Sequence, residues 1–374
     1  MQSKTQVVIV GGGVIGCATA YYLAKSQVKV IIVEPVSIAS GASGSSAGIL
    51  TPYSGSMNPK LLALSAPTLK LHSELNLSLY DEFGVDYGYQ LKPHIRCAFT
   101  PAGVENLMNW QIERKSEGFN TEWLSPDEAH RITGWLTGRI LGAVYSEIEP
   151  TIESYLFTHA LVNSAKNNGA SIIQSNVCGL IKGREGQSLG VFLEDGSRIE
   201  SDIVVLAMGP WAKNANDWLN WQVPVEPQKG QLLHLTDITN QPKLQLAITN
   251  FERGTIIVPK RLAKVIIGST KENTGFENGI TESARTDLIN SVSQISTVAA
   301  QSFIGGQTAC LRPYPYDGMP YVGKVPEWDN IYIATGHWSE GIHFSPVTGK
   351  WLSDHITTGK SNLDLSALDP ARKQ

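Results

Sequence analysis

The sequence is poor in cysteine, and the cysteines that it has are scattered. Its 374 residues include four of them, Cys17, Cys97, Cys178 and Cys310, and no two form a C-x-x-C pair. A disulfide framework or a cysteine-based zinc site needs closer and more regular spacing. The sequence therefore predicts reduced thiols and a cytoplasmic location.

Other absences exclude further classes of protein. The eight histidines are dispersed, and the nearest pair, His337 and His343, lacks acidic companions and metal-ligand spacing, so no metal site is expected. The net charge of −4 gives no basic field for nucleic acid or an anionic membrane. No apolar run reaches the roughly 18 residues of a membrane-spanning helix. The apolar N-terminus also lacks the basic region and cleavage site of a signal peptide.

What remains is the composition of an ordinary globular protein, with 42% hydrophobic and 17% charged residues and no internal repeats. A chain of this length can form two domains or one large one.

The clearest local pattern lies in residues 6–34. Val7–Val10 and Val28–Val33 are apolar runs with the length of buried parallel strands, and Val14–Lys25 between them reads as a helix.

Three glycines, Gly11, Gly13 and Gly16, form G-x-G-x-x-G between the first strand and the helix. Glycine at these positions permits a tight turn, close approach of the backbone to a pyrophosphate, and close helix–strand packing. Glu34 ends the second strand, where its carboxylate can accept hydrogen bonds from a ribose. The order strand, helix, strand and acid predicts dinucleotide binding, and a glycine-rich structural turn is the alternative.

A loop of small residues, ASGASGSSAGI, follows at 39–49. Small residues let backbone amides lie against a ligand, and Ser45, Ser46, Ala47 and Gly48 are the expected contacts. A flexible linker is the alternative. The position of the loop directly after Glu34 favours contact with the nucleotide.

The rest of the chain predicts a nucleotide-binding domain made of separated segments and interleaved with an antiparallel domain. Helices are expected at 61–83, from Ser125, and at 151–168, 281–298 and 342–355; strands are expected at 87–100, 170–173, 189–193, 198–199, 203–207, 232–235, 255–258, 265–268 and 331–334. The fold class is α/β, with a discontinuous Rossmann-like domain and an α+β substrate domain. The expected limits are 1–84, 149–222 and 308–374 for the first domain, and 85–148 and 223–307 for the second.

Several motifs together resemble the D-amino-acid-oxidase-like family of FAD flavoenzymes, and within it the glycine oxidase group. The resemblance covers nearly the whole chain. It is carried by the Gly11 motif with Glu34, Ser45–Gly48, Val204–Ala212, Lys229-Gly230-Gln231, Ile257-Val258-Pro259, Leu311-Arg312-Pro313 with Asp317-Gly318 and Pro320, and Gly336–Gly349. It implies FAD bound where the two domains meet.

The motif and the resemblance together give a set of expected cofactor contacts. These are Gly11, Gly13, Val14, Ile15, Gly16, Glu34, Pro35, Ser45, Ser46, Ala47, Gly48, Val177, Ala207, Gly209, Trp211, Arg312, Gly336, His337, Gly341 and Ile342. The glycine-containing loop before the 342–355 helix presents amide donors and a positive dipole end. These groups suit the N1/C2=O edge of a flavin.

The resemblance implies oxidation of a C–N bond in a small amino acid. Hydride passes from Cα to flavin N5, the imino acid hydrolyses to a 2-oxo acid and ammonia, and dioxygen is reduced to hydrogen peroxide. Arg312 is expected to anchor the substrate carboxylate, because a guanidinium binds a carboxylate in a bidentate manner. A salt bridge between the domains is the alternative role for Arg312.

The chain departs from glycine oxidases at two positions in the expected substrate pocket. Ile256 replaces a tyrosine, and Ser339-Glu340 replaces a stretch that contains an arginine. These changes remove a hydroxyl and a positive charge, which favours a bulkier or secondary amine over glycine. The expected substrate contacts are Arg312, Thr51, Ile256 and Ser339.

Lys271 and His337 are the other candidate catalytic residues. Lys271 lies where glycine oxidases have an apolar residue near the flavin, and a cation there would stabilise developing superoxide. An exposed hairpin lysine is the alternative. His337 is a candidate for polarising the flavin or the substrate, with a packed, hydrogen-bonded histidine as the alternative. Trp338 and Trp211 are expected to line the cofactor region or to belong to the core.

Cys310 raises the question of covalent FAD, because related sarcosine oxidases attach FAD through a cysteine directly before leucine. The residues after Cys310 match the non-covalent group instead, so a neutral buried thiol is the default. Three other functions stay open: an amino-acid dehydrogenase that reduces a quinone or protein, a flavoprotein module of a larger assembly, and a plain NAD dehydrogenase. The oligomeric state is also open, with a homo-oligomer among the options.

Overall fold

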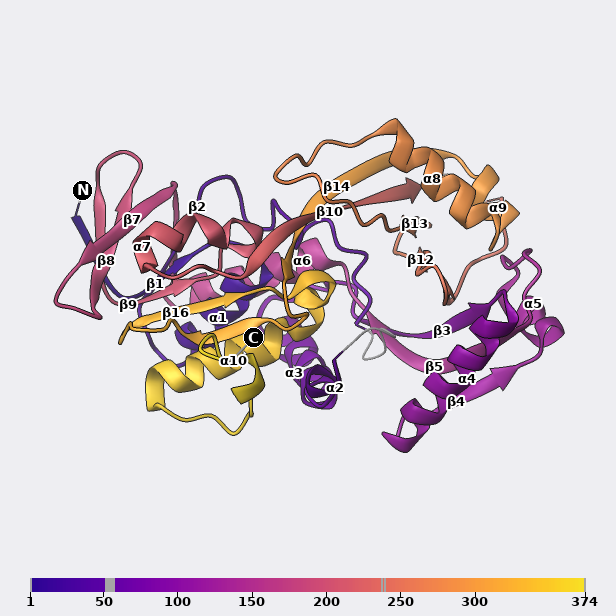
Figure 1. Cartoon of the computed structure of the whole chain (residues 1–374), viewed down its shortest axis with the longest axis horizontal. Coiled ribbons are helices and arrows are strands. Elements are labelled where there is room, and N and C mark those ends of the chain that lie inside the picture. Colours follow the sequence, from indigo (N-terminus) through magenta and orange to yellow (C-terminus); the bar gives the residue numbers. More distant parts are fainter. Residues whose placement is uncertain (1, 51–57, 237, 239, 373–374) are drawn as a thin grey trace.

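The computed structural model describes residues 2–50, 58–236, 238 and 240–372, which form two lobes, each built on an eight-stranded sheet (Figure 1). The first sheet contains β1 (Gln2–Val10), β2 (Val30–Glu34), β6 (Ser171–Gln174), β7 (Val177–Lys182), β8 (Ser188–Leu193), β9 (Arg198–Leu206), β15 (Tyr321–Lys324) and β16 (Ile331–Thr335). The second contains β3 (Gln90–Ala98), β4 (Thr121–Leu124), β5 (Gly142–Thr151), β10 (Val225–Leu235), β11 (Ala247–Asn250), β12 (Ile256–Pro259), β13 (Val265–Gly268) and β14 (Ile304–Pro315).

The helices distribute over both lobes. The α-helices are α1 (Val14–Lys25), α2 (Pro59–Leu62), α3 (Ser65–Phe83), α4 (Pro101–Ser116), α5 (Pro126–Thr133), α6 (Ser154–Asn167), α7 (Asn216–Leu219), α8 (Glu282–Ser293), α9 (Thr297–Gln301) and α10 (Gly341–Thr358). The short 3-10 helices are η1 (Gly209–Ala215), η2 (Trp338–Glu340) and η3 (Ser366–Leu368).

The first lobe is layered around a parallel core. β1 lies between β2 and β9 and runs parallel to both, with Val8 opposite Ile31 and Val204. Successive side chains of β1 face opposite sides: Val7 and Ile9 pack against α1, α6 and α10, and Val8 packs towards the β7–β8 hairpin and η1. Burial on both faces explains why these strands are continuously apolar.

The second lobe carries its sheet in the order β14-β10-β13-β12-β11-β3-β5-β4. All pairs are antiparallel except β3 with β11, which are parallel. α8 and α9 lie over one face, as Figure 1 shows. Leu232, Val258 and Ile266 point from the other face and pack against Ala47 and Ile49 of the first lobe. The two lobes therefore meet over the small-residue loop.

The predicted fold class is confirmed, and the local expectations differ from the structure mainly at element ends. Gly84 ends α3 in the left-handed conformation, and Ser125 begins α5 with a capping box. The helix expected at 281–298 is two helices, because the chain breaks after α8 and Ser296 caps α9. The helix expected from Thr151 begins at Ser154, because Thr151 still pairs with Gln90 in the sheet.

Two expected domain limits fall inside strands of the second sheet. Residue 149 lies in β5 and residue 308 lies in β14. β14 pairs along its whole length with β10, from Ile304 opposite Leu235 to Pro315 opposite Val225. The sheets thus assign Arg312, which lies on β14, to the second lobe.

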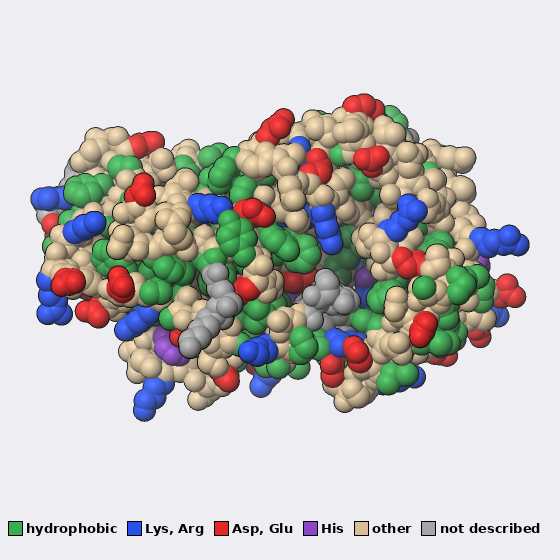
Figure 2. Space-filling view, viewed as in Figure 1, with side chains coloured by type: hydrophobic (Ala, Val, Ile, Leu, Met, Phe, Trp, Pro, Cys, Tyr) green, Lys and Arg blue, Asp and Glu red, His purple; other side chains and the backbone are tan. Residues whose placement is uncertain are grey.

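The surface shows no field of one charge sign on the face drawn in Figure 2, where basic and acidic side chains alternate over both lobes. Within the described ranges, no helix is both long and apolar enough to cross a membrane.

Candidate active site

A cavity of about 1360 Å³ lies between the first-lobe loops and the inner face of the second sheet. Most of the predicted site residues line it, although they come from distant parts of the chain. The lining includes Gly11, Gly13, Val14, Ile15, Glu34, Pro35, Ser45, Ser46, Ala47, Gly48, Val177, Ala207, Gly209, Trp211, Ile256, Lys271, Cys310, Arg312, His337, Ser339, Gly341 and Ile342.

Three predicted site residues are not among the described residues that line the cavity. Gly16 is not among the described lining residues; a Cβ there would overlap the carbonyl oxygen of Gly11, so Gly16 allows α1 to pack closely on its strand. Gly336 is also outside the described lining and adopts a positive φ of 78° in the turn before η2. Thr51 lies outside the described residues.

The start of α1 faces the cavity and provides an anion site. Gly13 is its N-cap and carries no capping side chain, and Gly13, Val14 and Ile15 all line the cavity. The Val14 N–H already donates to Ser43 Oγ at 2.9 Å. The other amides of the first turn and the positive end of the helix dipole attract phosphate oxygens. Glu34 lies beside them and accepts hydrogen bonds from the backbone N–H groups of Gly12, at 2.8 Å, and Val36, at 3.0 Å. Since a carboxylate has about four acceptor sites, it retains capacity for a ribose.

The start of α10 faces the same cavity through Gly341 and Ile342. His337 precedes it and is buried, with Nε2 hydrogen-bonded to Thr348 Oγ1 at 3.0 Å. Burial lowers the pKa of His337 to about 3, so its ring is neutral. Within the described structure, its Nδ1 is buried without a hydrogen-bond partner. A buried polar atom at a cavity wall fits a bound group that completes its hydrogen bonding.

The 45–48 loop is fixed from both sides. Lys260, directly after β12, donates hydrogen bonds to the carbonyl oxygens of Ala47, at 3.2 Å, and Ile152, at 2.6 Å. Gly48 has a positive φ of 69°, and a Cβ there would overlap the carbonyl of Ile152. Because Lys260 belongs to the second lobe, it ties the loop to the sheet that carries the opposite cavity wall.

Arg312 projects from β14 and is partly buried at the cavity wall. Its Nη1 donates to the carbonyl oxygen of Thr270 at 3.1 Å, and it forms no ion pair with any described residue. Gly230, on the neighbouring strand β10, makes room for it, because a Cβ there would overlap the guanidinium. Burial lowers the pKa of Arg312 from its usual value of 12.5, but the guanidinium stays charged.

Lys271 and Trp338 meet at the same wall. The Lys271 ammonium lies 4.9 Å from the centroid of the Trp338 ring. Trp338 Nε1 donates to Gln228 Oε1 at 2.7 Å, and its ring packs edge-on against Tyr314. Ser339 lines the cavity and donates to Glu340 Oε1 at 3.1 Å. Lys271 is exposed.

Cys310 lies two residues before Arg312 and is buried. Burial raises the pKa of its thiol above 9.0, so it is protonated at neutral pH. A neutral thiol is a poor nucleophile.

A second arginine at the cavity was not recognised in the sequence. Arg96, on β3, is buried and pairs with both oxygens of Glu149, at 2.6 and 2.9 Å. His94 Nδ1 also contacts Glu149, at 2.8 Å, and His94 Nε2 contacts Thr249 Oγ1 at 2.7 Å. The local signal was the alternation of three basic residues, Lys92, His94 and Arg96, in one strand, and the partners of the last two lie far away in the chain. Among the described residues, no histidine, cysteine or acidic group is arranged to hold a metal.

Three features of the structure indicate a dinucleotide-dependent oxidoreductase with two domains. They are the parallel sheet with its glycine-rich turn, the two helix starts at one cavity, and the arginine without an ion-pair partner on the opposite wall. The comparisons with known proteins identify the family.

The chain belongs to the FAD dependent oxidoreductase family (DAO), whose model matches residues 6–355. It is 28% identical over 375 residues to glycine oxidase of Geobacillus kaustophilus, covering 100% of this chain and 98% of the relative. It is 26% identical to glycine oxidase of Bacillus subtilis, covering 100% and 99%. A crystal structure of glycine oxidase from Geobacillus kaustophilus superposes with a TM-score of 0.91, at 27% identity and 100% coverage of both chains. The predicted resemblance is therefore confirmed.

The residues present fit FAD as the cofactor of this family. The α1 start and the 45–48 loop offer backbone amides, Glu34 offers acceptors, and the Nδ1 of His337 is buried at the wall beside the α10 start.

Proposed function

We propose that this chain is an FAD-dependent oxidase of a small amino acid of the glycine, sarcosine or D-amino acid type. FAD, when bound, supplies the acceptor for the hydride that leaves the substrate Cα. The substrate nitrogen provides the electron pair of the new C=N bond, water hydrolyses the imino acid to a 2-oxo acid and ammonia (or, from an N-substituted amino acid, the corresponding amine), and dioxygen takes up the two electrons as hydrogen peroxide. The glycine oxidase relatives support this reaction class.

The observation that carries the proposal is the unpaired guanidinium of Arg312. It is held at the cavity wall by the carbonyl of Thr270, and no described acidic group forms an ion pair with it. Partial burial of a guanidinium without an ion-pair partner costs free energy, unless a bound anion neutralises its charge and accepts its hydrogen bonds. The carboxylate of an amino acid matches its fork geometry.

The other proposed contacts favour a neutral amine with an apolar substituent. Ile256 offers only aliphatic surface, and His337 is uncharged at neutral pH. Ile256 and Ser339 support a preference for a bulkier or secondary amine over glycine, and Thr51 stays a proposed contact.

Lys271 is the proposed group for the reaction with dioxygen. Its ammonium lies over the Trp338 ring, and its backbone directly follows Thr270, whose carbonyl holds Arg312. A positive charge there stabilises the charge that develops on oxygen. Replacement of Lys271 by methionine should slow flavin reoxidation by air by about a hundredfold, the lower end of the loss for one electrostatic contact, and should leave anaerobic reduction by substrate unchanged.

Cofactor attachment is proposed to be non-covalent, because Cys310 is a neutral thiol. Acid precipitation tests this directly: yellow colour in the supernatant supports it, and colour in the pellet contradicts it. The four cysteines are free, and three are buried, which supports a cytoplasmic location.

The function is tested by adding glycine, sarcosine, D-alanine, D-proline and L-proline to the purified holoenzyme, first without oxygen and then in air. Loss of the flavin colour followed by peroxide formation supports the oxidase. Loss of colour without peroxide in air would instead identify a dehydrogenase with another electron acceptor. No bleaching by any amino acid would overturn the proposal.

A further inference from the structure

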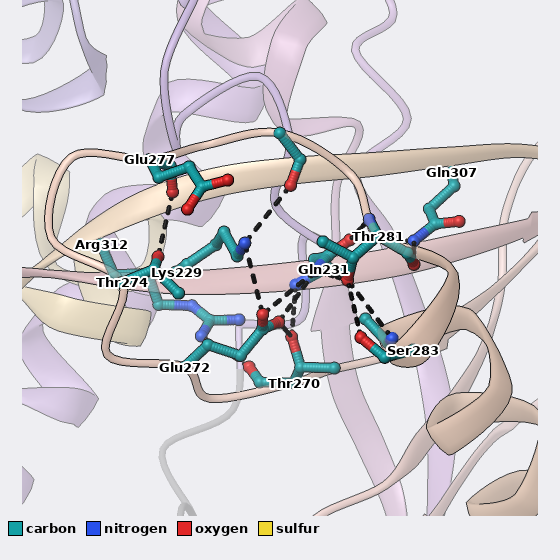
Figure 3. Close-up of polar contacts among 12 residues, drawn as sticks. Lys229, Gln231, Thr270, Glu272, Thr274, Glu277, Thr281, Ser283, Gln307 and Arg312 are labelled. Atoms are coloured by element: carbon teal, nitrogen blue, oxygen red, sulfur yellow. Dashed lines mark hydrogen bonds and ion pairs between the residues drawn. The ribbon is translucent and has the colours of Figure 1, made fainter.

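A polar network that includes the buried side chains of Lys229 and Gln231 lies next to Arg312 (Figure 3). Its centre is Glu272, in the turn that follows β13 and joins the second sheet to α8. The Glu272 carboxylate accepts hydrogen bonds from Gln231 Nε2, at 2.9 Å, and from the Thr270 hydroxyl. It also pairs with the ammonium of Lys229 at 3.4 Å. Lys229 is only 1% exposed, so Glu272 supplies a counter-charge that water cannot replace.

The network anchors the turn at both ends. Towards α8, Gln231 Oε1 accepts from the backbone N–H of Thr281 at 2.9 Å, and Gln307 Nε2 donates to Gln231 Oε1 at 2.9 Å. Towards β13, the backbone N–H of Gln231 donates to Thr270 Oγ1 at 2.9 Å. Backbone hydrogen bonds between Lys229 and Glu272, at 2.8 and 2.9 Å, close the arrangement.

This turn contains Lys271 and contacts Arg312, the two cations of the proposed site. The carbonyl oxygen of Thr270 holds Arg312, and Lys271, the next residue, places its ammonium over Trp338. Glu272 is adjacent and turns inward, so its contacts decide where the Thr270 carbonyl and the Lys271 backbone lie. A shift of this turn would move the two cations together.

We infer that Glu272 is a positioning residue that sets the geometry of Arg312 and Lys271 through Thr270, Gln231 and Lys229. The inference rests on the proposed function, since it assigns Glu272 a part in carboxylate binding and in the reaction with dioxygen. Glu272 acts through other residues and does not itself line the described cavity.

Three variants test the inference in the holoenzyme. Glu272→Met removes every acceptor of the side chain but leaves Lys229 buried without a counter-charge, so a second variant combines Lys229→Met with Glu272→Met. A third, Thr270→Val, removes only the hydroxyl and keeps the backbone carbonyl. Glu277→Gln is the matched control, because Glu277 is an exposed acid on the same segment.

The measurements are the Kd of acetate from the change in flavin absorbance, the KM and kcat for the best amino acid, and the rate of flavin reoxidation in air. Misplacement of a binding group by about 1 Å costs up to about a hundredfold. We expect Kd and KM to rise at least tenfold in both Glu272 variants and reoxidation to slow, with a smaller effect in Thr270→Val and none in Glu277→Gln.

A purely structural role makes a different prediction. In that case the double variant and Thr270→Val would lose only thermal stability, and the folded protein would keep the wild-type Kd and KM within twofold, which would overturn the inference. Failure of the proposed function is distinguishable from this, because the wild-type protein would then be neither bleached by amino acids nor perturbed by acetate.

Discussion

Two arginines on the same sheet, both at the cavity wall, have opposite surroundings. Arg96 on β3 is buried and pairs with both oxygens of Glu149, with His94 as a third member. Arg312 on β14 is partly buried, holds one backbone carbonyl, and has no ion-pair partner among the described residues. The first cation is satisfied by the fold, and the second keeps donors for a ligand. The comparison separates an arginine that the fold already neutralises from one that keeps hydrogen-bonding capacity, and the second is the proposed carboxylate anchor.

The largest expected effect is on stability at Arg96. Arg96→Met leaves Glu149 buried without its cation, and breaking a buried pair from one side costs about 3–5 kcal/mol. Urea denaturation of the holoenzyme should show this loss. Arg96→Met combined with Glu149→Leu should recover much of it, because no charge is then left unpaired, and a double variant as unstable as the single one would contradict the assignment.

Replacement of Arg312 should have the opposite pattern, with little effect on stability and a large effect on substrate binding. Arg312→Met removes a cation that forms no ion pair with a described carboxylate and is stabilised only at longer range by Glu272 and Glu340, so the free energy of unfolding should change by less than about 1 kcal/mol. The KM for an amino acid should rise by about a hundredfold, equivalent to about 2.7 kcal/mol for a lost charged hydrogen-bonded pair. An amine without a carboxylate should be unaffected. Equal losses for both kinds of amine would disprove the anchor.

Acid should weaken the Arg96 region. Burial alone would raise the pKa of Glu149, but Arg96 and His94 outweigh it and hold this pKa far below 4.5. Burial, together with Arg96, lowers the pKa of His94 below 6.5. Both groups therefore bind protons more readily in the unfolded chain, so stability is present at neutral pH and is lost as the pH falls below about 6.5 for His94 and about 4.5 for Glu149.

Each group contributes a slope of up to about 1.4 kcal/mol per pH unit. Unfolding free energies measured by urea titration between pH 7 and pH 4 should follow this decline. The variant that lacks both Arg96 and Glu149 should show a shallower dependence, and a profile identical to that of the wild type would place the acid-sensitive groups elsewhere.

The smallest expected effect is on KM and comes from Gly230, whose lack of a side chain leaves space for the Arg312 guanidinium. A Cβ at Gly230 would overlap its guanidinium, so Gly230→Ala should displace the side chain and raise the KM for an amino acid by about tenfold. Gly306→Ala on the paired strand β14 is the control, because a Cβ there has only the Cβ of His234 nearby, at 4.0 Å. Steady-state kinetics of the two variants should separate them, and similar values would mean that Arg312 adapts without cost.

The sequence predicted the first lobe better than the second. Residues 6–34 form a strand, a helix and a strand in direct succession, and the structure has β1, α1 and β2 there. The helix at Pro101–Ser116 and the strand at Gly142–Thr151 were not predicted. In the second lobe the strands pair across long stretches of chain, and their polar residues find partners that no local pattern indicates.

The sequence by itself determined the dinucleotide-binding half, because its turns, caps and apolar periods act between neighbouring residues. It also selected Arg312, through the motif around it. Only the tertiary structure decided which arginine is neutralised and which is open, because Glu149 and Thr270 reach Arg96 and Arg312 through strand pairing rather than through sequence proximity. The charge balance of a buried group is a property of its three-dimensional neighbours, since Coulomb interactions and desolvation depend on distance in space.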